Sequence, residues 1–446
     1  MRKLFRSFLM VGALVSVNAT AMNLTFKVSE VTPDNNKVTV IIDGKEKVVT
    51  LDANGQGSIE LTNFKPQYVQ IRHGRQQKKL YLEADKDLML SYAPSTLYKE
   101  VAFEGPNAAI NQYLSSPIKA MGYNDASVPE ADFIQKANDQ LNENLQTLKS
   151  KNFPKEFADK EADRLIYYTL SGLPMYPVFY PYVSKDTAYK ASPVIFNEVR
   201  KFAKYNGDLL YHPEYRDFIN SAATLLSMEK SGIVKDQKQM VNQQMDYISS
   251  NINDPKVQEF LMNQVVYGYV ENNGLENPVF ETNFKKFVKD QEKIQKFNNL
   301  LSVWEKIKVG APSPSFNYKD INGKDIALSD LKGKLVYIDV WATWCGPCRG
   351  EIPHLKKLEE KYHGKDIEFV SISCDQNKEA WEKMVAKEEL KGVQLHHGGD
   401  REFMEAYLIK GIPRFILLDK EGKIVSANMT RPSNPATEAR INELLD

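Results

Sequence analysis

Two cysteines, Cys345 and Cys348, are separated by Gly346 and Pro347 and stand where an apolar strand pattern changes to a helical one. A Cys-x-x-Cys at the first turn of a helix places its first thiol beside unpaired backbone N–H groups and the positive end of the helix dipole. Both effects favour the thiolate and lower the pKa of Cys345 below the ordinary value of about 8.5. Such a thiolate attacks a disulfide, and Cys348 then resolves the mixed disulfide. The spacing therefore predicts thiol-disulfide exchange, with Cys345 as nucleophile.

Two other uses of a Cys-x-x-Cys pair are disfavoured. A structural zinc site needs four ligands, and no second Cys or His pair stands at a suitable spacing. Covalent haem attachment needs a histidine directly after the second cysteine, where this chain has Arg349. We therefore expect neither a metal nor a cofactor.

The elements around the cysteines alternate between strands and helices. Asn322-Gly323 between two short apolar runs predicts a hairpin before them. The other expected elements are strands at 335–340, 367–373, 393–396, 415–418 and 423–425, and helices from the cysteines to 362, from 378 and over 403–407. Strands that alternate with helices predict a sheet covered on both faces.

The first residues have the pattern of a signal peptide. Three basic residues among the first six precede an apolar run over 8–17, and Ala19-Thr20-Ala21 supplies the small residues of a cleavage site. The run is shorter than the about 20 residues that span a bilayer, and no later segment is apolar for long enough. No cysteine follows the predicted cleavage after Ala21. We expect residues 1–21 to be removed, leaving a periplasmic chain that is not a lipoprotein and has no transmembrane anchor.

Composition excludes several classes of protein. With 58 basic and 58 acidic side chains among 446 residues, the formal net charge is zero, and no overall field attracts DNA, RNA or an anionic membrane. We therefore expect no nucleic-acid partner. Three cysteines in a chain of this length are too few for a disulfide-braced scaffold. The length itself predicts several domains.

Two regions precede the one that carries the cysteines. Over 22–105, short β-branched and aromatic runs alternate with turn pairs such as Asp43-Gly44, which predicts a β-sandwich accessory domain. Over 106–308, apolar residues recur at intervals of three and four, which predicts a helical domain. The expected fold is therefore multidomain: an N-terminal β-sandwich, a mostly α-helical middle region and a C-terminal α/β domain over 309–446.

One segment of the middle region, 167–183, interleaves aromatic residues with Pro174, Pro177 and Pro181. Prolines at this density argue against a continuous helix, so we expect a loop packed on its neighbours. The alternative hypothesis is a docking surface for a partner between Tyr176 and Tyr182.

The segment from Val336 to Arg349 resembles the active-site strand and helix of thioredoxins, including the motif Trp344-Cys345-Gly346-Pro347-Cys348. The Ala311-Pro312 pair, the Asn322-Gly323 hairpin and the export pattern resemble more narrowly the exported TlpA/ResA-like branch of thiol-disulfide oxidoreductases. The resemblance covers 309–446, about the last third of the chain. It implies a thioredoxin fold there and a redox disulfide between Cys345 and Cys348.

Two acidic residues are further candidates for catalysis. Asp339 stands in the middle of an apolar strand, where burial of a lone carboxylate would raise its pKa, unless the strand end exposes it. By resemblance, Asp339 matches the buried acid of thioredoxins that helps to deprotonate the resolving cysteine, so it is the predicted general base for Cys348. Glu351 matches an acid that affects thiol reactivity in ResA-like proteins; a solvated helix glutamate is the alternative.

The expected substrate-binding residues are Trp344, Ile412 and Pro413. In thioredoxin-fold proteins the proline that matches Pro413 follows a cis bond and faces the dithiol. The backbone of Ile412 is then placed to pair with an extended substrate segment. Trp344, beside the nucleophile, is expected to shape the contact surface. Arg414 is expected to be a surface residue, with an influence on substrate choice as the alternative.

Cys374 is the odd cysteine. Because free cysteine packs well in protein interiors, we expect a buried inert thiol. A third redox thiol is the alternative.

These residues predict an extracytoplasmic disulfide reductase that takes electrons from a membrane donor and acts on exported proteins. The Gly346-Pro347 pair favours reduction because reducing thioredoxins have the same pair. A disulfide oxidase or isomerase is an alternative that differs only in redox potential. Another is a binding module for a protein or cell-surface ligand through the first 300 residues. A peroxidase is disfavoured, because peroxidatic cysteines normally stand in a Thr/Ser-x-x-Cys setting.

Overall fold

The computed structural model describes residues 21–445, except residues 64, 233, 235 and 276. The predicted signal peptide therefore lies outside the described residues, apart from Ala21. The described residues form two compact units, which divide between Glu198 and Val199. Their border falls inside the predicted helical domain, and the domain boundaries stay a prediction. No helix among the described residues is long and apolar enough to cross a membrane.

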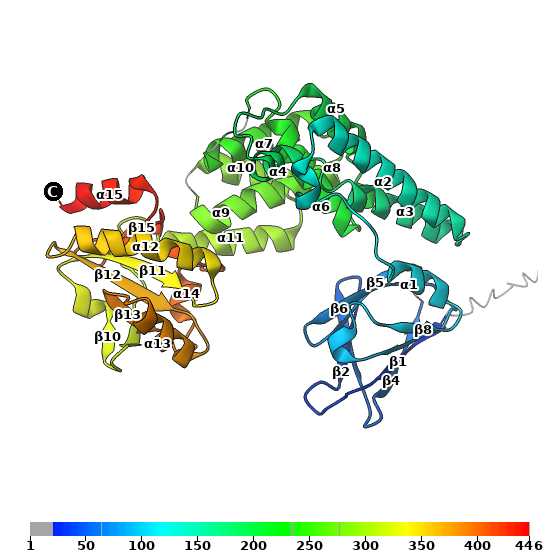
Figure 1. Ribbon diagram of the computed structural model, residues 1–446, viewed down its shortest axis with the longest axis horizontal. Helices are drawn as coiled ribbons and strands as arrows, with labels where there is room; N and C mark the ends of the chain where they lie inside the picture. The colour runs from blue at the N-terminus through cyan, green and yellow to red at the C-terminus, as the bar shows by residue number, and fades with distance from the viewer. Residues whose placement is uncertain (1–20, 64, 233, 235, 276, 446) are drawn as a thin grey trace, which may run out of the picture. The chain divides into compact units, whose positions relative to one another are not determined.

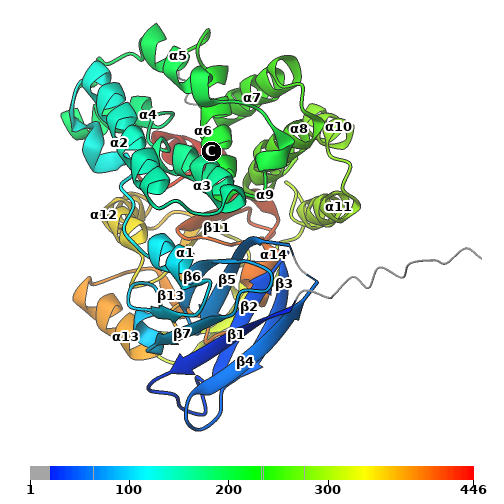
Figure 2. The same ribbon diagram turned by 90° about the vertical axis from the view of Figure 1, so that its right-hand side faces the viewer.

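The first unit begins with two four-stranded sheets (Figure 2), which confirms the predicted β-sandwich. One sheet has the order β4-β1-β7-β8, with strands Gln56–Thr62, Ala21–Val28, Leu88–Tyr92 and Ala102–Glu104. The other has the order β3-β2-β5-β6, with strands Lys45–Thr50, Lys37–Ile42, Gln67–His73 and Gln76–Leu82. Alternate residues such as Leu24, Phe26, Val38 and Val40 form one buried core between them.

The rest of this unit is helical, as expected. The helices are α1 (Ala108–Leu114), α2 (Glu130–Ser150), α3 (Lys155–Thr169), α4 (Tyr176–Ser184) and α5 (Pro193–Phe202), which crosses the border between the units. In α2, the residues Phe133, Ala137, Leu141 and Leu148 are buried, so the three-to-four spacing of apolar residues does mark one packed face. Short 3-10 turns lie at Pro94–Thr96 and Tyr123–Ser127.

The aromatic-proline segment differs from the prediction. The helix is interrupted between α3 and α4, as the prolines indicated, but α4 itself is helical and the expected loop is wrong there. Pro177 lies in the first turn, where no intrahelical donor is required, and Pro181 stands inside the helix, where it costs one backbone hydrogen bond. Burial of Tyr176 against Phe133, with ring centroids 4.7 Å apart, offsets that cost.

In the described part of the second unit, six α-helices and one π-helical turn follow α5. They are α6 (Pro213–Ser227), α7 (Gln237–Asn251), α8 (Pro255–Met262), the π-helix Asn263–Tyr267, α9 (Gly268–Asn273), α10 (Pro278–Phe287) and α11 (Gln291–Lys306), with a 3-10 turn at Gly207–Leu209. Asp254 caps α8 by accepting hydrogen bonds from the backbone N–H groups of Lys256 and Val257.

The C-terminal domain is a seven-stranded sheet in the order β10-β9-β13-β12-β11-β14-β15. Its strands are β9 (Asn317–Asp320), β10 (Asp325–Ala327), β11 (Leu335–Trp341), β12 (Ile367–Ser373), β13 (Val393–His396), β14 (Arg414–Leu418) and β15 (Ile424–Met429). Its helices are α12 (Gly346–Lys361), α13 (Lys378–Lys387), α14 (Glu402–Ala406) and α15 (Pro435–Leu445), with a 3-10 turn at Leu328–Leu331. Figure 1 shows α12 and α15 on one side of this sheet and α13 on the other.

The central strand, β11, positions the site. All seven of its residues are buried, and it pairs in parallel with β12 and antiparallel with β14. Leu335 and Tyr337 pack with Leu355 and Leu358 of α12 in one core. Because the side chains of a strand alternate, Asp339 lies on this α12 face of the sheet.

Candidate active site

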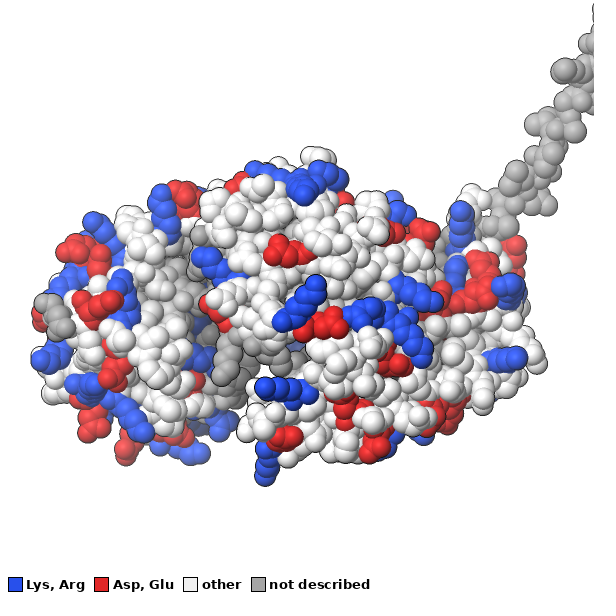
Figure 3. Space-filling model, turned by 90° about the horizontal axis from the view of Figure 1, so that it is seen from above, with Lys and Arg blue, Asp and Glu red and all other residues white. Residues whose placement is uncertain are grey.

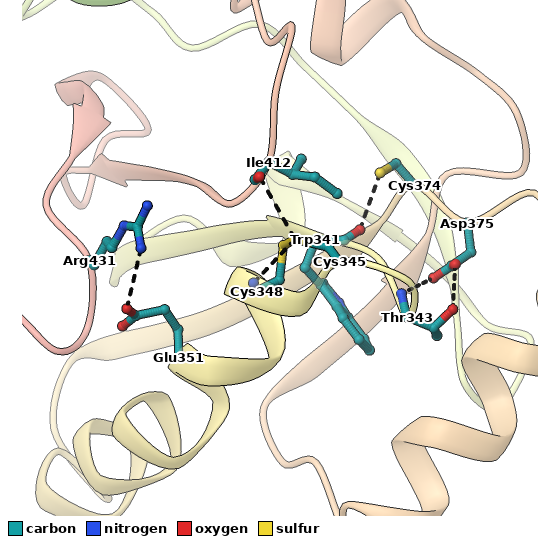
Figure 4. The surroundings of a disulfide bond; sticks show 9 residues. All are labelled: Trp341, Thr343, Cys345, Cys348, Glu351, Cys374, Asp375, Ile412 and Arg431. Atoms are coloured by element: carbon teal, nitrogen blue, oxygen red, sulfur yellow. Dashed lines mark hydrogen bonds and ion pairs between the residues drawn. A yellow bond between two sulfur atoms is a disulfide. The ribbon is translucent and has the colours of Figure 1, made fainter. Parts of the chain in front are cut away.

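The two cysteines of the motif form a disulfide at the start of α12 (Figure 4). Cys345 is the N-cap residue, and its Sγ accepts a hydrogen bond from the backbone N–H of Cys348 at 3.2 Å. That donor is one of the unpaired N–H groups of the helix start, and it stabilises negative charge on Cys345 Sγ when the pair is reduced. Cys345 and Cys348 are both nearly buried, whereas the neighbouring Trp344 is 71% exposed.

The loop before β14 lies beside the nucleophile. The Ile412–Pro413 peptide bond is cis, which confirms the bond that the resemblance implied. The carbonyl oxygen of Ile412 is 3.7 Å from Cys345 Sγ, and its side chain packs against the cluster that holds both cysteines. The fold thus brings Ile412 and Pro413 next to the disulfide. Their part in substrate binding, like that of Trp344, stays a prediction.

Arg414 departs from the expectation of a surface residue. It is 6% exposed, and Nη1 donates to the carbonyl oxygen of Asn272 at 3.4 Å. Burial lowers the pKa of its guanidinium. The expected surface arginine is therefore wrong, because Arg414 follows Pro413 into the first position of the buried strand β14.

Asp339 is buried in β11, so the alternative of an exposed strand end is wrong. Its Oδ1 has no hydrogen-bond partner among the described residues. Burial, then the charges of Glu351 and Glu359, raise the pKa of this carboxyl to about 8. A carboxyl that titrates near neutral pH is suited to accept and return a proton. Asp339 thus has the electrostatic setting that a general base needs, and its role stays a prediction.

Glu351 is buried as well, and the alternative of a solvated helix glutamate is wrong. Its two carboxylate oxygens accept hydrogen bonds from the backbone N–H of Ser433 at 3.0 Å and from Ser433 Oγ at 2.9 Å. Arg431 Nη1 lies 3.9 Å from Oε1 (Figure 4). These partners satisfy the carboxylate in the interior, where its charge acts on Asp339.

Glu359 is a third acid that the sequence analysis missed. It lies two helical turns after Glu351 on α12, and burial raises its pKa to about 7. Its charge also raises the pKa of Asp339. The interval of eight residues between two glutamates on one helix was the signal that could have grouped it with Glu351.

Cys374 follows β12 and packs against the cluster that contains the disulfide. Its Sγ lies 3.3 Å from the carbonyl oxygen of Trp341, and burial, followed by the charge of Asp375, raises its pKa to about 11. A thiol with this pKa is protonated at neutral pH and is a poor nucleophile. These features favour the inert thiol over a third redox thiol.

Comparison with known proteins places the similarity in the C-terminal region. The Redoxin family model matches residues 308–445. The thiol-disulfide oxidoreductase ResA of Bacillus cereus is 35% identical over 130 residues, which are 29% of this chain and 74% of ResA. ResA of Bacillus subtilis is 30% identical over 150 residues, which are 34% of this chain and 81% of that protein.

Solved structures include two similar chains from Bacteroides vulgatus. A candidate thiol-disulfide oxidoreductase solved in solution is 71% identical, covers 31% of this chain and 92% of its own, and has a TM-score of 0.29. The thioredoxin domain of a thiol-disulfide oxidoreductase is 29% identical, with coverages of 31% and 99% and a TM-score of 0.30. With TM-scores below 0.5, these two matches carry no structural argument.

Proposed function

This chain belongs to the TlpA/ResA-like thiol-disulfide oxidoreductases of the thioredoxin superfamily, and from that membership we propose that it is an extracytoplasmic disulfide reductase acting on exported proteins. The observation that carries the proposal is the position of Cys345. Its Sγ accepts a hydrogen bond from the N–H of Cys348 in the first turn of α12 and lies 3.7 Å from the carbonyl oxygen of Ile412, beside the exposed Trp344. We expect a substrate disulfide to reach Cys345 across Trp344. The extended substrate segment that carries the disulfide can then pair with the backbone of Ile412.

The proposed reaction has two exchange steps. The Cys345 thiolate attacks one sulfur of the substrate disulfide, which forms a mixed disulfide and releases the other substrate sulfur as a thiolate that takes up a proton. Cys348 passes its proton to Asp339, directly or through a water, and attacks Cys345 Sγ. The second substrate sulfur leaves and is protonated. The substrate gains two electrons and two protons, and the enzyme is left with the Cys345–Cys348 disulfide. A dithiol donor, which we place at the membrane, reduces this disulfide back to the dithiol and is itself oxidised to a disulfide.

The surroundings of the dithiol support reduction over oxidation. A strongly oxidising couple requires a stabilised reduced form, as in a dithiol whose thiolate is strongly favoured. Here Glu351 is buried on α12, one turn after Cys348, and its negative charge opposes further negative charge on sulfur. The Gly346-Pro347 pair resembles that of reducing thioredoxins.

We expect the reduced full-length protein to reduce a disulfide-bonded, unfolded substrate protein with a stoichiometry of one disulfide per chain. Cys345→Ser should give no reduction. Cys374→Ser is the matched control and should retain the rate, because its half-buried thiol has a raised pKa. The assay follows substrate thiols by trapping and mass spectrometry. Disulfide formation in reduced substrate, with no reduction of oxidised substrate, would contradict the proposed direction.

For the location, we expect the mature protein to begin at Met22 and to be recovered from the periplasm. The side chain of Met22 is buried in β1, so cleavage after Ala21 leaves the core of the sandwich intact. Intact-mass measurement and N-terminal sequencing of protein from fractionated cells check this. Recovery of a chain that begins at Met1 from the cytoplasmic fraction would show that the segment does not direct export.

The alternative of a binding module in the first 300 residues stays a prediction. On α4, Val178 is 47% exposed and Tyr182 is 76% exposed, four residues apart on one side of the helix. Figure 3 shows basic and acidic side chains interspersed over the face it draws. Such a mixed surface does not attract a partner with a strong charge of one sign.

A further inference from the structure

A buried carboxylate lies beside the turn that presents the nucleophile. Asp375, which follows β12, is 2% exposed and accepts three hydrogen bonds through its side chain (Figure 4 shows the two from Thr343). Thr343 donates twice, from its backbone N–H to Oδ2 at 2.9 Å and from Oγ1 to Oδ1 at 2.7 Å. Ser373 Oγ donates to Oδ2 at 2.8 Å. Hydrogen bonds to a charged acceptor are the strong ones among protein hydrogen bonds.

Thr343 belongs to the short turn that joins β11 to α12. β11 ends at Trp341 and α12 begins at Gly346, so residues 342–345 carry the chain from the sheet to the nucleophile. Within the turn, the N–H of Cys345 donates to the carbonyl oxygen of Ala342 at 3.1 Å. The side chain of Trp344, in the same turn, is exposed to solvent. The two bonds from Thr343 to Asp375 therefore tie the middle of the turn to the neighbouring strand end.

Asp375 is itself held from a third strand. His396 of β13 donates from Nε2 to the carbonyl oxygen of Asp375 at 2.8 Å, and its Nδ1 accepts from the N–H of Gly398 at 3.2 Å. This pair of contacts assigns a neutral imidazole with the proton on Nε2. Trp381 of α13 packs on its ring, with centroids 5.1 Å apart. The backbone of Asp375 is thus held by a side chain of β13 that packs on α13, outside the dithiol motif.

We propose that Asp375 is a positioning residue for the redox reaction, and that it acts through Thr343. By holding the N–H and the hydroxyl of Thr343 together, it fixes the 342–345 turn and so aligns Cys345 Sγ with the N–H of Cys348. If the turn becomes more mobile, the hydrogen bond from the Cys348 N–H to Cys345 Sγ is formed for a smaller fraction of the time. The Cys345 thiolate is then less stabilised. The proposal rests on the dithiol as the redox centre and is independent of the direction of electron flow.

The test is the rate of alkylation of Cys345 by iodoacetamide in the reduced full-length protein, measured against pH, with the label located by mass spectrometry. In Thr343→Val, which keeps the shape and the N–H but removes the hydroxyl, we expect a higher alkylation midpoint and a rate at neutral pH lower by about twofold to tenfold, the factor that one hydrogen bond is worth. Thr343→Ser should restore both values. Thr282→Val, the same change at an exposed position of α10, is the matched control.

A second variant keeps the test decisive if valine destabilises the fold. Asp375→Asn retains the size of the side chain but offers one acceptor oxygen in place of two, and it should raise the midpoint as Thr343→Val does. The other titratable groups near the turn are unchanged in both threonine variants: Asp339, Cys348, Cys374, Asp375 and His396.

Two results would overturn the proposal. One is a folded Thr343→Val or Asp375→Asn protein with the wild-type midpoint and rate, since a merely structural role would lower only the melting temperature. The other is a Thr343→Ser protein as slow as Thr343→Val, since the hydroxyl would then not be the cause. No substrate or electron donor enters the assay, so a failure of the proposed reductase function leaves its outcome unaffected.

Discussion

Replacing Cys348 with serine is expected to stop the reaction after its first step, with the substrate protein left covalently attached to Cys345. The nucleophile, its N–H donor and the exposed Trp344 are unchanged in Cys348→Ser, so the mixed disulfide still forms. Without the resolving thiol it persists, and turnover falls by about three orders of magnitude or more, the scale seen when a covalent catalytic group is removed. Non-reducing electrophoresis and peptide mass spectrometry of the adduct measure both effects.

Two further cysteine variants are the controls for this result. Cys345→Ser should form no adduct, and Cys374→Ser should turn over as the wild type does. An adduct that forms on Cys374, or one that appears in Cys345→Ser, would mean that the order of attack assigned to the dithiol is wrong.

The second large effect is expected from Asp339→Asn. An amide cannot accept the proton of Cys348, so the mixed disulfide should accumulate during turnover and kcat should fall by about a hundredfold, the lower end of general acid–base contributions. Rapid acid quenching followed by thiol trapping measures the fraction of enzyme held as the mixed disulfide. An unchanged kcat with no accumulation would remove Asp339 from the reaction.

The same variant is expected to change the pH dependence of stability. The pKa of Asp339 is raised from the ordinary 3.8 to about 8 in the folded chain, so between these values the folded state keeps a proton that the unfolded state has released. The free energy of unfolding therefore falls as pH rises from about 4 to about 8, by a few kcal/mol in all. In Asp339→Asn this loss should be absent.

Urea unfolding of the full-length protein at several pH values across this range measures the effect. Asp325→Asn, a change at an exposed carboxylate of β10, is the matched control and should keep the wild-type pH dependence. If Asp339→Asn loses stability with pH as steeply as the wild type, the buried carboxyl of Asp339 is not the group that titrates.

Elements with a strong and bounded apolar pattern were predictable to the residue. β12 and β13 occupy the predicted residues, because each apolar run ends at a polar turn. In contrast, the signal for β4 is weak: Ile59 and Leu61 alternate with polar residues, but β4 is an edge strand and only Leu61 is buried. The helix α4 was missed because tertiary packing of Tyr176 outweighs the local effect of the prolines.

The candidate site divides in the same way. Cys345, Cys348 and Asp339 stand in one continuous segment, so the motif and its strand located them together. Asp375 comes from another strand, and only the register of β11 on β12, in which Trp341 pairs with Ser373, brings it beside Thr343. A register between strands that are distant in sequence leaves no local pattern, and the same holds for the contact of Glu351 with Ser433.

The most direct test of the proposed function is the midpoint potential of the Cys345–Cys348 couple in the full-length protein. It is obtained by equilibration with redox buffers and thiol trapping. A reductase that needs an electron donor should have a value of about −270 mV or lower, near that of thioredoxin. A value near about −120 mV, that of a strong oxidant, would contradict the reductase function and reverse the direction of electron flow.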